Sequence, residues 1–380
     1  MPDFIRAVGL GLLYLPLMTI NIFNTIYADT SPITPESPKA ITYPNIDRGL
    51  NESLYPDEEI TAKKIADIIE KSIRKEYSTG IALRDAHPKA HGCVRAEFKI
   101  AEALPKELAQ GIFLPGKTYQ AWIRFSNGSS NAQQADIKKD ARGMAIKLLA
   151  VPGERLLNHD EMSTQDFIMI NHPVFFVNDP ARYMAFMQDI NSESFLKKLH
   201  TPFALGAKGT WIALNTRNTI SNPLQTRYWS MVPYQLGTGS GRQAVKYSAQ
   251  ACSRGTDPIP YNPHNNFLRE NLRNQLQKSK ACMEFLVQPR TSNSMSVEDS
   301  MTEWPENQAP FYKLATIHIP QQVFDTPEQN EFCENLSFTP WHTVPEHKPL
   351  GGVNRMRKVI YERISQLRHE MNATKRLEPH

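Results

Sequence analysis

The sequence lacks an excess of charge of either sign and has no dense basic block. In 380 residues, 43 lysines and arginines stand against 39 aspartates and glutamates, a formal net charge of +4. Proteins that bind nucleic acid usually cluster their basic residues on one surface, so we expect no nucleic-acid partner. The chain also contains no HExxH pattern and no CxxC pair, which excludes two common zinc-site signatures.

Glycine is scarce relative to proline, with 18 glycines and 28 prolines. This balance favours a loop-rich protein with extended segments over a helical bundle. Glycines gather at 237–241, but no Lys-Ser or Lys-Thr pair follows them and segments with strand character flank them. They therefore predict a β-hairpin and not a phosphate-binding loop.

The four cysteines lie far apart in the sequence, at Cys93, Cys252, Cys282 and Cys333. An exported protein can form disulfides, and full pairing of four cysteines allows three connectivities. The alternative for Cys93 is a buried free thiol.

Long apolar runs are limited to the N-terminus. Residues 7–20 are mostly apolar and follow Arg6, and the small residue Ala28 closes the segment. This pattern predicts a signal peptide over residues 1–28 and export, in our interpretation to the periplasm. An uncleaved anchor is the alternative, but Pro16 and Asn21 leave the run too short for a comfortable membrane span.

After the signal peptide, residues 29–56 are rich in proline, serine and threonine, which predicts a linker or extended arm. Residues 57–380 then form one domain. Isoleucines at helical spacing predict a helix over 57–76. Residues of alternating polarity predict strands at 93–100, 121–126, 145–149, 167–170, 174–177, 227–235, 243–250, 282–288 and 313–319. With helical insertions at 181–199 and 265–280, the fold class is α+β, a closed antiparallel barrel of about eight strands.

The segment from Arg355 to Asn372 contains no glycine or proline and predicts a helix. Arg357, Tyr361 and Arg368 fall within a sector of roughly 40° on it. A cation beside a phenol favours the phenolate, and tyrosinate is one of the few protein ligands of haem iron. The alternative is an amphipathic surface helix whose tyrosine packs against the core.

Two upstream positions carry further candidates. His87 lies in a polar run that Pro88 keeps from being helical, and an ordinary loop histidine is the alternative interpretation. Arg124 lies inside a strand, where an unpaired arginine would be costly to bury. It is therefore either exposed or paired with an anion.

These segments, taken in order, resemble those of haem catalases. The matching strings are Arg84-Asp-Ala-His87, Arg124-Phe-Ser-Asn127, Lys139 to Lys147, Pro173 to Pro180, and Arg357-xxx-Tyr361. The resemblance is firm over residues 84–183 and 337–368, and looser over 226–336. It implies a haem b cofactor and a C-terminal helix that supplies the iron ligand.

The resemblance also implies a role for each matching residue. Tyr361, supported by Arg357, would bind the iron, and His87 would transfer protons, with Ser126 fixing its tautomer. The remaining positions, expected to bind the cofactor, are Arg84, Arg124 and Arg368 at the propionates and Phe175 stacked on the ring.

One position departs from the family pattern. The register of Pro173 places Ile170 where catalases have an asparagine, and Asn171 would face the opposite side of the strand. We therefore expect a hydroperoxidase that acts on hydrogen peroxide or organic hydroperoxides with weak catalase turnover. Two alternatives are a haem-binding envelope protein with little turnover and an enzyme that rearranges lipid hydroperoxides.

Overall fold

The computed structural model of the protein describes residues 41–157, 160–253 and 255–379. Contacts divide the chain into Met1–Ala40 and Ile41–His380, and all described residues belong to the second unit. The predicted signal peptide, 1–28, and the first part of the predicted linker lie outside the described residues, so both stay predictions.

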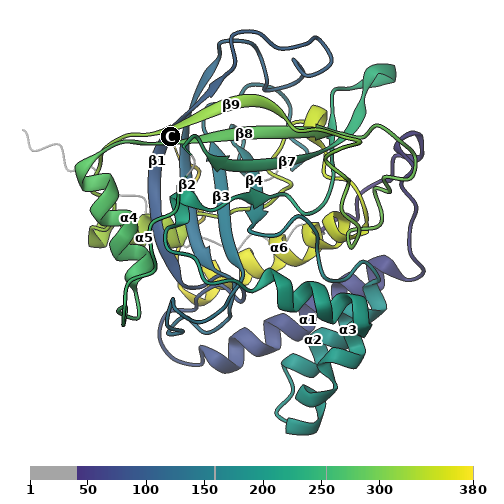
Figure 1. Cartoon of the computed structure of the whole chain (residues 1–380). Helices are drawn as coiled ribbons and strands as arrows, with labels where there is room; N and C mark the ends of the chain where they lie inside the picture. The colour runs from purple at the N-terminus through teal and green to yellow at the C-terminus, as the bar shows by residue number, and fades with distance from the viewer. Residues whose placement is uncertain (1–40, 158–159, 254, 380) are drawn as a thin grey trace, which may run out of the picture. The chain divides into compact units, whose positions relative to one another are not determined.

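Within the described residues, nine strands form one antiparallel sheet that closes on itself (Figure 1). The order is β5-β4-β3-β2-β1-β9-β8-β7, and β5 pairs again with β7 to complete a ring of eight; β6 adds to β7. This confirms the predicted closed barrel. The strands are β1 Ala90–Ile100, β2 Thr118–Asn127, β3 Arg142–Leu148, β4 Gln165–Ile170, β5 Tyr228–Trp229, β6 Tyr234–Leu236, β7 Gln243–Ala251, β8 Ala281–Pro289 and β9 Tyr312–Ile319.

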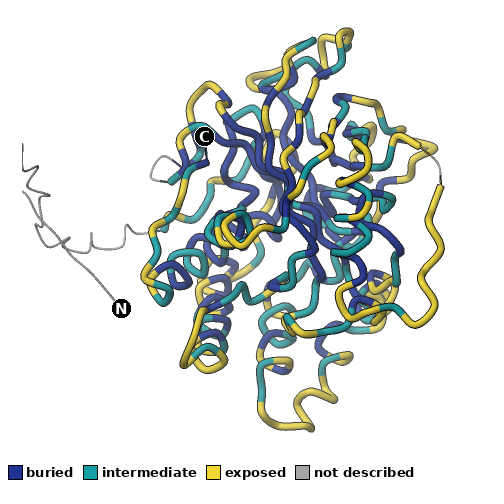
Figure 2. The backbone as a smooth tube through the Cα atoms, turned by 90° about the vertical axis from the view of Figure 1, so that its left-hand side faces the viewer, coloured by how far each residue is buried: buried dark blue, intermediate teal, exposed yellow. Residues whose placement is uncertain are grey.

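Large apolar side chains fill the barrel interior. Phe98, Phe125, Phe167 and Phe285 are almost completely buried there, and Figure 2 shows the strands as the buried centre of the molecule. Successive side chains of a strand point to opposite faces, so Arg124, the neighbour of Phe125, lies on the outer face. The polar candidates on β2 are thereby placed outside the barrel.

The helices lie below the barrel and at one side of it (Figure 1), and two of them matter most for the site. α1 and α6 pack together through Ile65, Ile69, Met356 and Ile360, and Figure 1 shows them running below the barrel. The α-helices in the described residues are α1 Glu58–Glu76, α2 Pro180–Ile190, α3 Phe195–Thr216, α4 Phe267–Lys278, α5 Pro327–Asn335 and α6 Gly352–Met371.

Most predicted elements are confirmed, but several differ. The strand predicted at 227–235 is divided into β5 and β6, and the helix predicted at 181–199 is divided into α2 and the longer α3. The strand predicted at 174–177 is wrong, because this segment makes no strand ladder; Phe175 N donates singly to Ser300 O. Helix α5 was not predicted, although Thr326 caps its start by accepting a hydrogen bond from Gln329 N. At nine residues, α5 is too short to show a clear helical period in the sequence.

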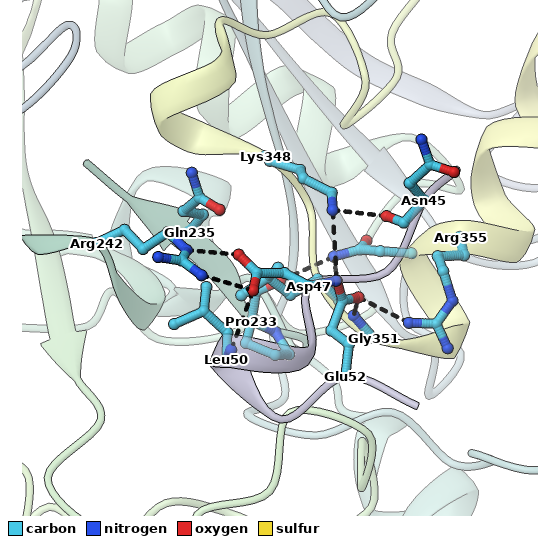
Figure 3. A network of polar contacts seen from close by, with 12 residues as sticks. Asn45, Asp47, Leu50, Glu52, Pro233, Gln235, Arg242, Lys348, Gly351 and Arg355 are labelled. Atoms are coloured by element: carbon cyan, nitrogen blue, oxygen red, sulfur yellow. Dashed lines mark hydrogen bonds and ion pairs between the residues drawn. The ribbon is translucent and has the colours of Figure 1, made fainter. Parts of the chain in front are cut away.

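The segment that precedes α1 contributes to a buried polar network that fastens the first turn of α6 (Figure 3). Arg355, fully buried, donates to Glu52 Oε1 and to Glu58 Oε1, each at 2.7 Å, and to Glu298 Oε1 at 2.9 Å. If one partner of such a buried cluster is removed, the remaining charges stay buried with neither a counterion nor water to solvate them. The network therefore fixes α6 only two turns before Tyr361.

Both disulfides join distant parts of the chain, and they select one of the three predicted connectivities. Cys93 on β1 is bonded to Cys333 on α5, and Cys252 is bonded to Cys282 on β8. The free-thiol alternative for Cys93 is therefore wrong. Among the described residues, none of the helices has the length and apolar character that crossing a membrane requires.

Candidate active site

A cavity lies between the outer face of the barrel and α6. The space free of protein atoms there is about 910 Å³, which includes the part open to solvent. Its walls come from the 84–87 loop, β2, β3, β4, residues 336–338 and α6. Most of the walls are apolar, through side chains that include Ile69, Met144, Ile168, Phe338 and Ile364.

His87 lies on the cavity wall in a constrained conformation. Its φ of 61° is left-handed, which is uncommon for residues other than glycine. Arg124 Nη2 donates to the His87 carbonyl oxygen at 2.9 Å, and His87 Nδ1 lies 3.0 Å from Ser126 Oγ. The predicted contact with Ser126 is confirmed, and the backbone and the ring of His87 are both held.

The electrostatic environment keeps His87 neutral. Burial, reinforced by the nearby charges of Arg124 and Arg357, lowers the pKa of His87 to about 4. A neutral imidazole at physiological pH can accept a proton. His91 does not line the cavity, and its Nε2 is hydrogen-bonded to Asn127 Oδ1 at 2.9 Å in a buried polar network. This geometry is consistent with the choice of His87 over His91 as the proton-transferring residue.

Gly143 provides the space for the imidazole. A β-carbon at this position would lie 2.6 Å from His87 Nδ1 and 2.7 Å from Ser126 Oγ. Gly143 is paired across the sheet with Ser126 on one side and with Ile170 on the other. Directly paired residues share a face, so Ser126, Gly143 and Ile170 form one row across the three strands. Ser126 and Gly143 adjoin the imidazole, whereas Ile170 lies outside the residues that line the cavity and packs beside Phe175.

On the opposite side, Tyr361 reaches the cavity from α6. Arg357 Nη2 donates to Tyr361 Oη at 3.1 Å, and the guanidinium carbon lies 4.9 Å from the centre of the ring. Burial alone would lower the pKa of Arg357, but Tyr361 and Tyr234 outweigh it and raise that pKa. The cation predicted to support the phenol is therefore in contact with it.

Three arginines from distant segments meet at one end of the cavity, as predicted for a dianionic group. Arg84, Arg124 and Arg368 all line it. Burial, followed by repulsion from Arg84, lowers the pKa of Arg124 to about 9, and the same causes lower the pKa of Arg368 to about 9. Arg124 Nε is buried without a hydrogen-bond partner in the described residues. The arginine cluster, as we call these three residues, is therefore short of negative charge.

Phe175 does not join this arrangement. It lies outside the residues that line the cavity and packs instead beside Ile170 and Val353, with its ring 6.0 Å from that of Tyr183. Its expected stacking on a cofactor stays a prediction.

Three residues of the site were not singled out from the sequence: Asp85 and Gly143 in the cavity wall and Glu334 beside the arginine cluster. Burial raises the pKa of Asp85 to about 6. The signal for Asp85 and Gly143 was their position inside the strings Arg84–His87 and Lys139–Lys147. Glu334 had no such signal.

A second polar cluster lies elsewhere on the outer face, where Glu161, Asp166 and His342 converge. Lys147 Nζ already fills the space between them, 2.8 Å from Asp166 Oδ1 and bonded to Glu161. Burial would lower the pKa of His342, but Glu161 and the other carboxylates raise it to about 9. The cluster is an ion-pair network, and its geometry does not favour a metal ion.

Comparison with known protein families gives a consistent result. Residues 67–199 match the model of the catalase family. Catalase T of Saccharomyces cerevisiae (strain YJM789) is 22% identical over 295 residues, which cover 70% of this chain and 50% of that protein. The peroxisomal catalase of Candida albicans is 23% identical over 265 residues, 62% of this chain and 50% of that protein. The chain thus spans about half the length of the curated relatives it matches.

Solved structures show the same fold. A fungal catalase superimposes with a TM-score of 0.61 at 20% identity, over 81% of this chain and 62% of that one. Catalase A from Saccharomyces cerevisiae gives a TM-score of 0.57 at 19% identity, over 80% of this chain and 67% of that one. At these identities the superpositions establish the barrel and its helices.

Proposed function

We propose that this chain, which belongs to the catalase family, is a haem-dependent hydroperoxidase that acts on hydrogen peroxide or organic hydroperoxides. The observation that carries the proposal is that His87 and Tyr361, more than 270 positions apart, line one apolar cavity whose end holds three arginines. A proton acceptor, an iron ligand and an anion-binding end are the parts that such an enzyme needs.

The residues present fit haem b. Tyr361, with Arg357 against its hydroxyl, would provide the iron ligand. The arginine cluster, which is short of negative charge, would bind the two propionates. The apolar side chains Ile69, Met144 and Ile168 would contact the ring. When bound, the haem supplies the iron at which a hydroperoxide is reduced.

His87 would move the proton of the reaction. A hydrogen on Nδ1 donated to Ser126 Oγ leaves Nε2 as the basic nitrogen. Nε2 takes the proton of the hydroperoxide O–H group and returns it to the oxygen that leaves as water or alcohol. Arg124 assists by holding the His87 carbonyl, which keeps the imidazole at a fixed position.

Ile170 would set the balance between substrates. A full catalase cycle oxidises a second peroxide, whose positioning benefits from a hydrogen-bond donor near the imidazole. Ile170 offers no hydrogen bond from its place in the row with Gly143 and Ser126. We therefore propose weak oxygen release, with one-electron donors and bulkier hydroperoxides comparatively favoured.

We also propose that the protein is exported, with the periplasm as its compartment. The apolar run ending at Ala28 and the two disulfides, which persist in oxidising compartments, support this. N-terminal sequencing of the protein from cell fractions tests it: a chain that begins near Asp29 in the exported fraction is expected, and an intact Met1 form in the cytoplasm would contradict it.

The absorption spectrum of the haem-loaded protein tests the main proposal. Tyr361→Phe should lose the spectrum of a tyrosinate-bound ferric haem and most of the bound haem, whereas Tyr261→Phe, a change at a fully exposed position, should retain both. An unchanged spectrum in Tyr361→Phe would refute the assignment.

Activity assays separate the candidate functions. Oxygen evolution from hydrogen peroxide, oxidation of a one-electron donor and turnover of a fatty-acid hydroperoxide are measured on the same sample. No turnover in any of the three would favour a haem-binding protein over an enzyme.

A further inference from the structure

A carboxylate occupies the arginine cluster, although the family pattern of the sequence did not point to it. Glu334 Oε1 lies 2.6 Å from Arg84 Nη1 and 3.3 Å from Arg368 Nη1, and Glu334 Oε2 lies 3.9 Å from Arg124 Nη2. One anion is thus shared by all three cations at the end of the cavity.

The segment that carries Glu334 is held in place from two sides. Its neighbour Cys333 is bonded to Cys93, the cross-strand partner of Arg124 on β1. On the other side, carbonyl groups in the last turn of α5 and just after it accept hydrogen bonds from the arginine cluster: Arg368 Nη1 donates to Glu334 O at 2.6 Å, and Arg84 Nη2 donates to Leu336 O at 2.6 Å.

The end of α5 therefore suits cations for two reasons. Helix C-termini leave carbonyl groups without intrahelical partners and carry a partial negative charge. Glu334 adds a full negative charge at the same place, with 23% of its side chain exposed. The helix end and Glu334 together carry less negative charge than the three guanidinium groups carry positive charge. Arg124 Nε, which has no hydrogen-bond partner among the described residues, remains available to another acceptor.

The formal charges of the arginine cluster and Glu334 do not cancel, and their sum can be compared with the charge of the cofactor. Three arginines and one glutamate sum to +2, and a haem with two ionised propionates carries −2 at its edge. If Glu334 were neutral, the remainder would be +3. Glu334 thus lowers the net positive charge of the cluster to the value that a dianion neutralises.

We propose that Glu334 is the resident counterion of the arginine cluster: it keeps the three guanidinium groups together in the haem-free protein and tunes the site to a dianionic edge. This inference rests on the proposed haem site and deepens it. Glu334 is a positioning residue, because it acts through the arginines and does not contact the reacting atoms.

Comparison of haem with its dimethyl ester, which lacks the two negative charges, isolates this role. In Glu334→Gln the haem-free protein should melt at a lower temperature, because three cations then repel one another. Haem should bind about tenfold more tightly than to the wild type, the effect of removing one competing charge from a partly buried ion pair. The affinity for the dimethyl ester should not change.

Three further variants control the experiment. Glu331→Gln removes an exposed carboxylate from the same helix and should behave as wild type. Glu334→Asp should restore the melting temperature in part. The double variant Arg84→Gln, Glu334→Gln removes one charge of each sign, so the ratio of haem to ester affinity should return to the wild-type value.

The two proposals fail in different ways. If Glu334→Gln bound haem no more tightly than the wild type, or weakened haem and ester equally, Glu334 would be a structural residue only and the inference would be overturned. If instead the wild-type protein bound neither ligand, the haem site itself would be refuted. Should Glu334→Gln fail to fold, the double variant still decides: a ratio that differs from the wild type overturns the inference.

Discussion

Replacement of Gly143 by alanine should displace His87 without touching the cation end of the cavity. The added methyl carbon would lie 2.6 Å from His87 Nδ1 and 2.7 Å from both His87 Cε1 and Ser126 Oγ. Non-bonded heavy atoms settle at roughly 3.5–4.0 Å. The imidazole must therefore withdraw by about 1 Å.

The magnitude follows from how His87 is held. Its carbonyl oxygen is hydrogen-bonded to Arg124, so the whole loop cannot shift to relieve the clash. The imidazole itself must move out of its position. A displacement of about 1 Å from a reactive position costs roughly 100-fold in rate, or about 2.7 kcal/mol in the activation barrier. The crowding should also lower the stability of the protein by about 1–3 kcal/mol.

The assay is the rate at which the haem-loaded protein reacts with hydrogen peroxide, followed by stopped-flow absorption. Gly143→Ala should bind haem with an unchanged tyrosinate spectrum and react about 100-fold more slowly. Gly241→Ala, at an exposed position where a β-carbon meets nothing within 4 Å, is the matched control. If Gly143→Ala folded, bound haem and reacted within twofold of wild type, the role assigned to His87 would be wrong.

Three further predictions follow from charge and polarity in the cavity. Because the pKa of His87 is lowered to about 4, the rate of the first peroxide reaction should stay level from pH 7 to about 5. It should fall only as His87 becomes protonated, and a decline centred near pH 6.5 would contradict this. Because burial raises the pKa of Asp85 from 3.8 to about 6, the native state holds more protons than the unfolded chain in that interval. Stability must then decrease as pH rises through it. Asp85→Asn should therefore be about 1–3 kcal/mol more stable than wild type at pH 7 in urea denaturation, with no advantage at pH 3. Ile170→Asn should raise oxygen evolution more than it raises oxidation of a one-electron donor, and equal changes in both rates would count against the proposed role of Ile170.

The sequence predicted those parts of the site that depend on local periodicity. Strand alternation placed Arg124 and Ser126 on one face of β2, and helical periodicity placed Arg357 beside Tyr361. Both relations are seen in the structure, where Arg124 and Ser126 both contact His87 and Arg357 contacts Tyr361. Periodicity alone gives no information on contacts between distant segments. The prediction that the polar face of β2 and the Tyr361 face of α6 line the same site came from the family resemblance.

The parts that escaped prediction depend on tertiary contacts of segments without a strong local pattern. Glu334 lies 210 residues after Arg124, on a short helix whose only local signals are its cap and first-turn proline. The pairing of Cys93 with Cys333 could not be chosen among three connectivities from spacing alone. Phe175 was assigned to a strand, and its segment is instead irregular and contacts Ser300.

The structure also decides how Asn171 relates to the position that Ile170 occupies. Asn171 Oδ1 accepts a hydrogen bond from Arg142 N at 2.7 Å, and Asn171 N donates to Arg142 O. The buried carboxamide is thus committed to the backbone of Arg142 at the start of β3. Turning it toward the cavity would leave the Arg142 amide without its partner, at a cost of about 1–3 kcal/mol. Asn171 therefore does not substitute for an amide at position 170, and the cross-strand row that continues from Ser126 and Gly143 ends in an aliphatic side chain that offers no hydrogen bond.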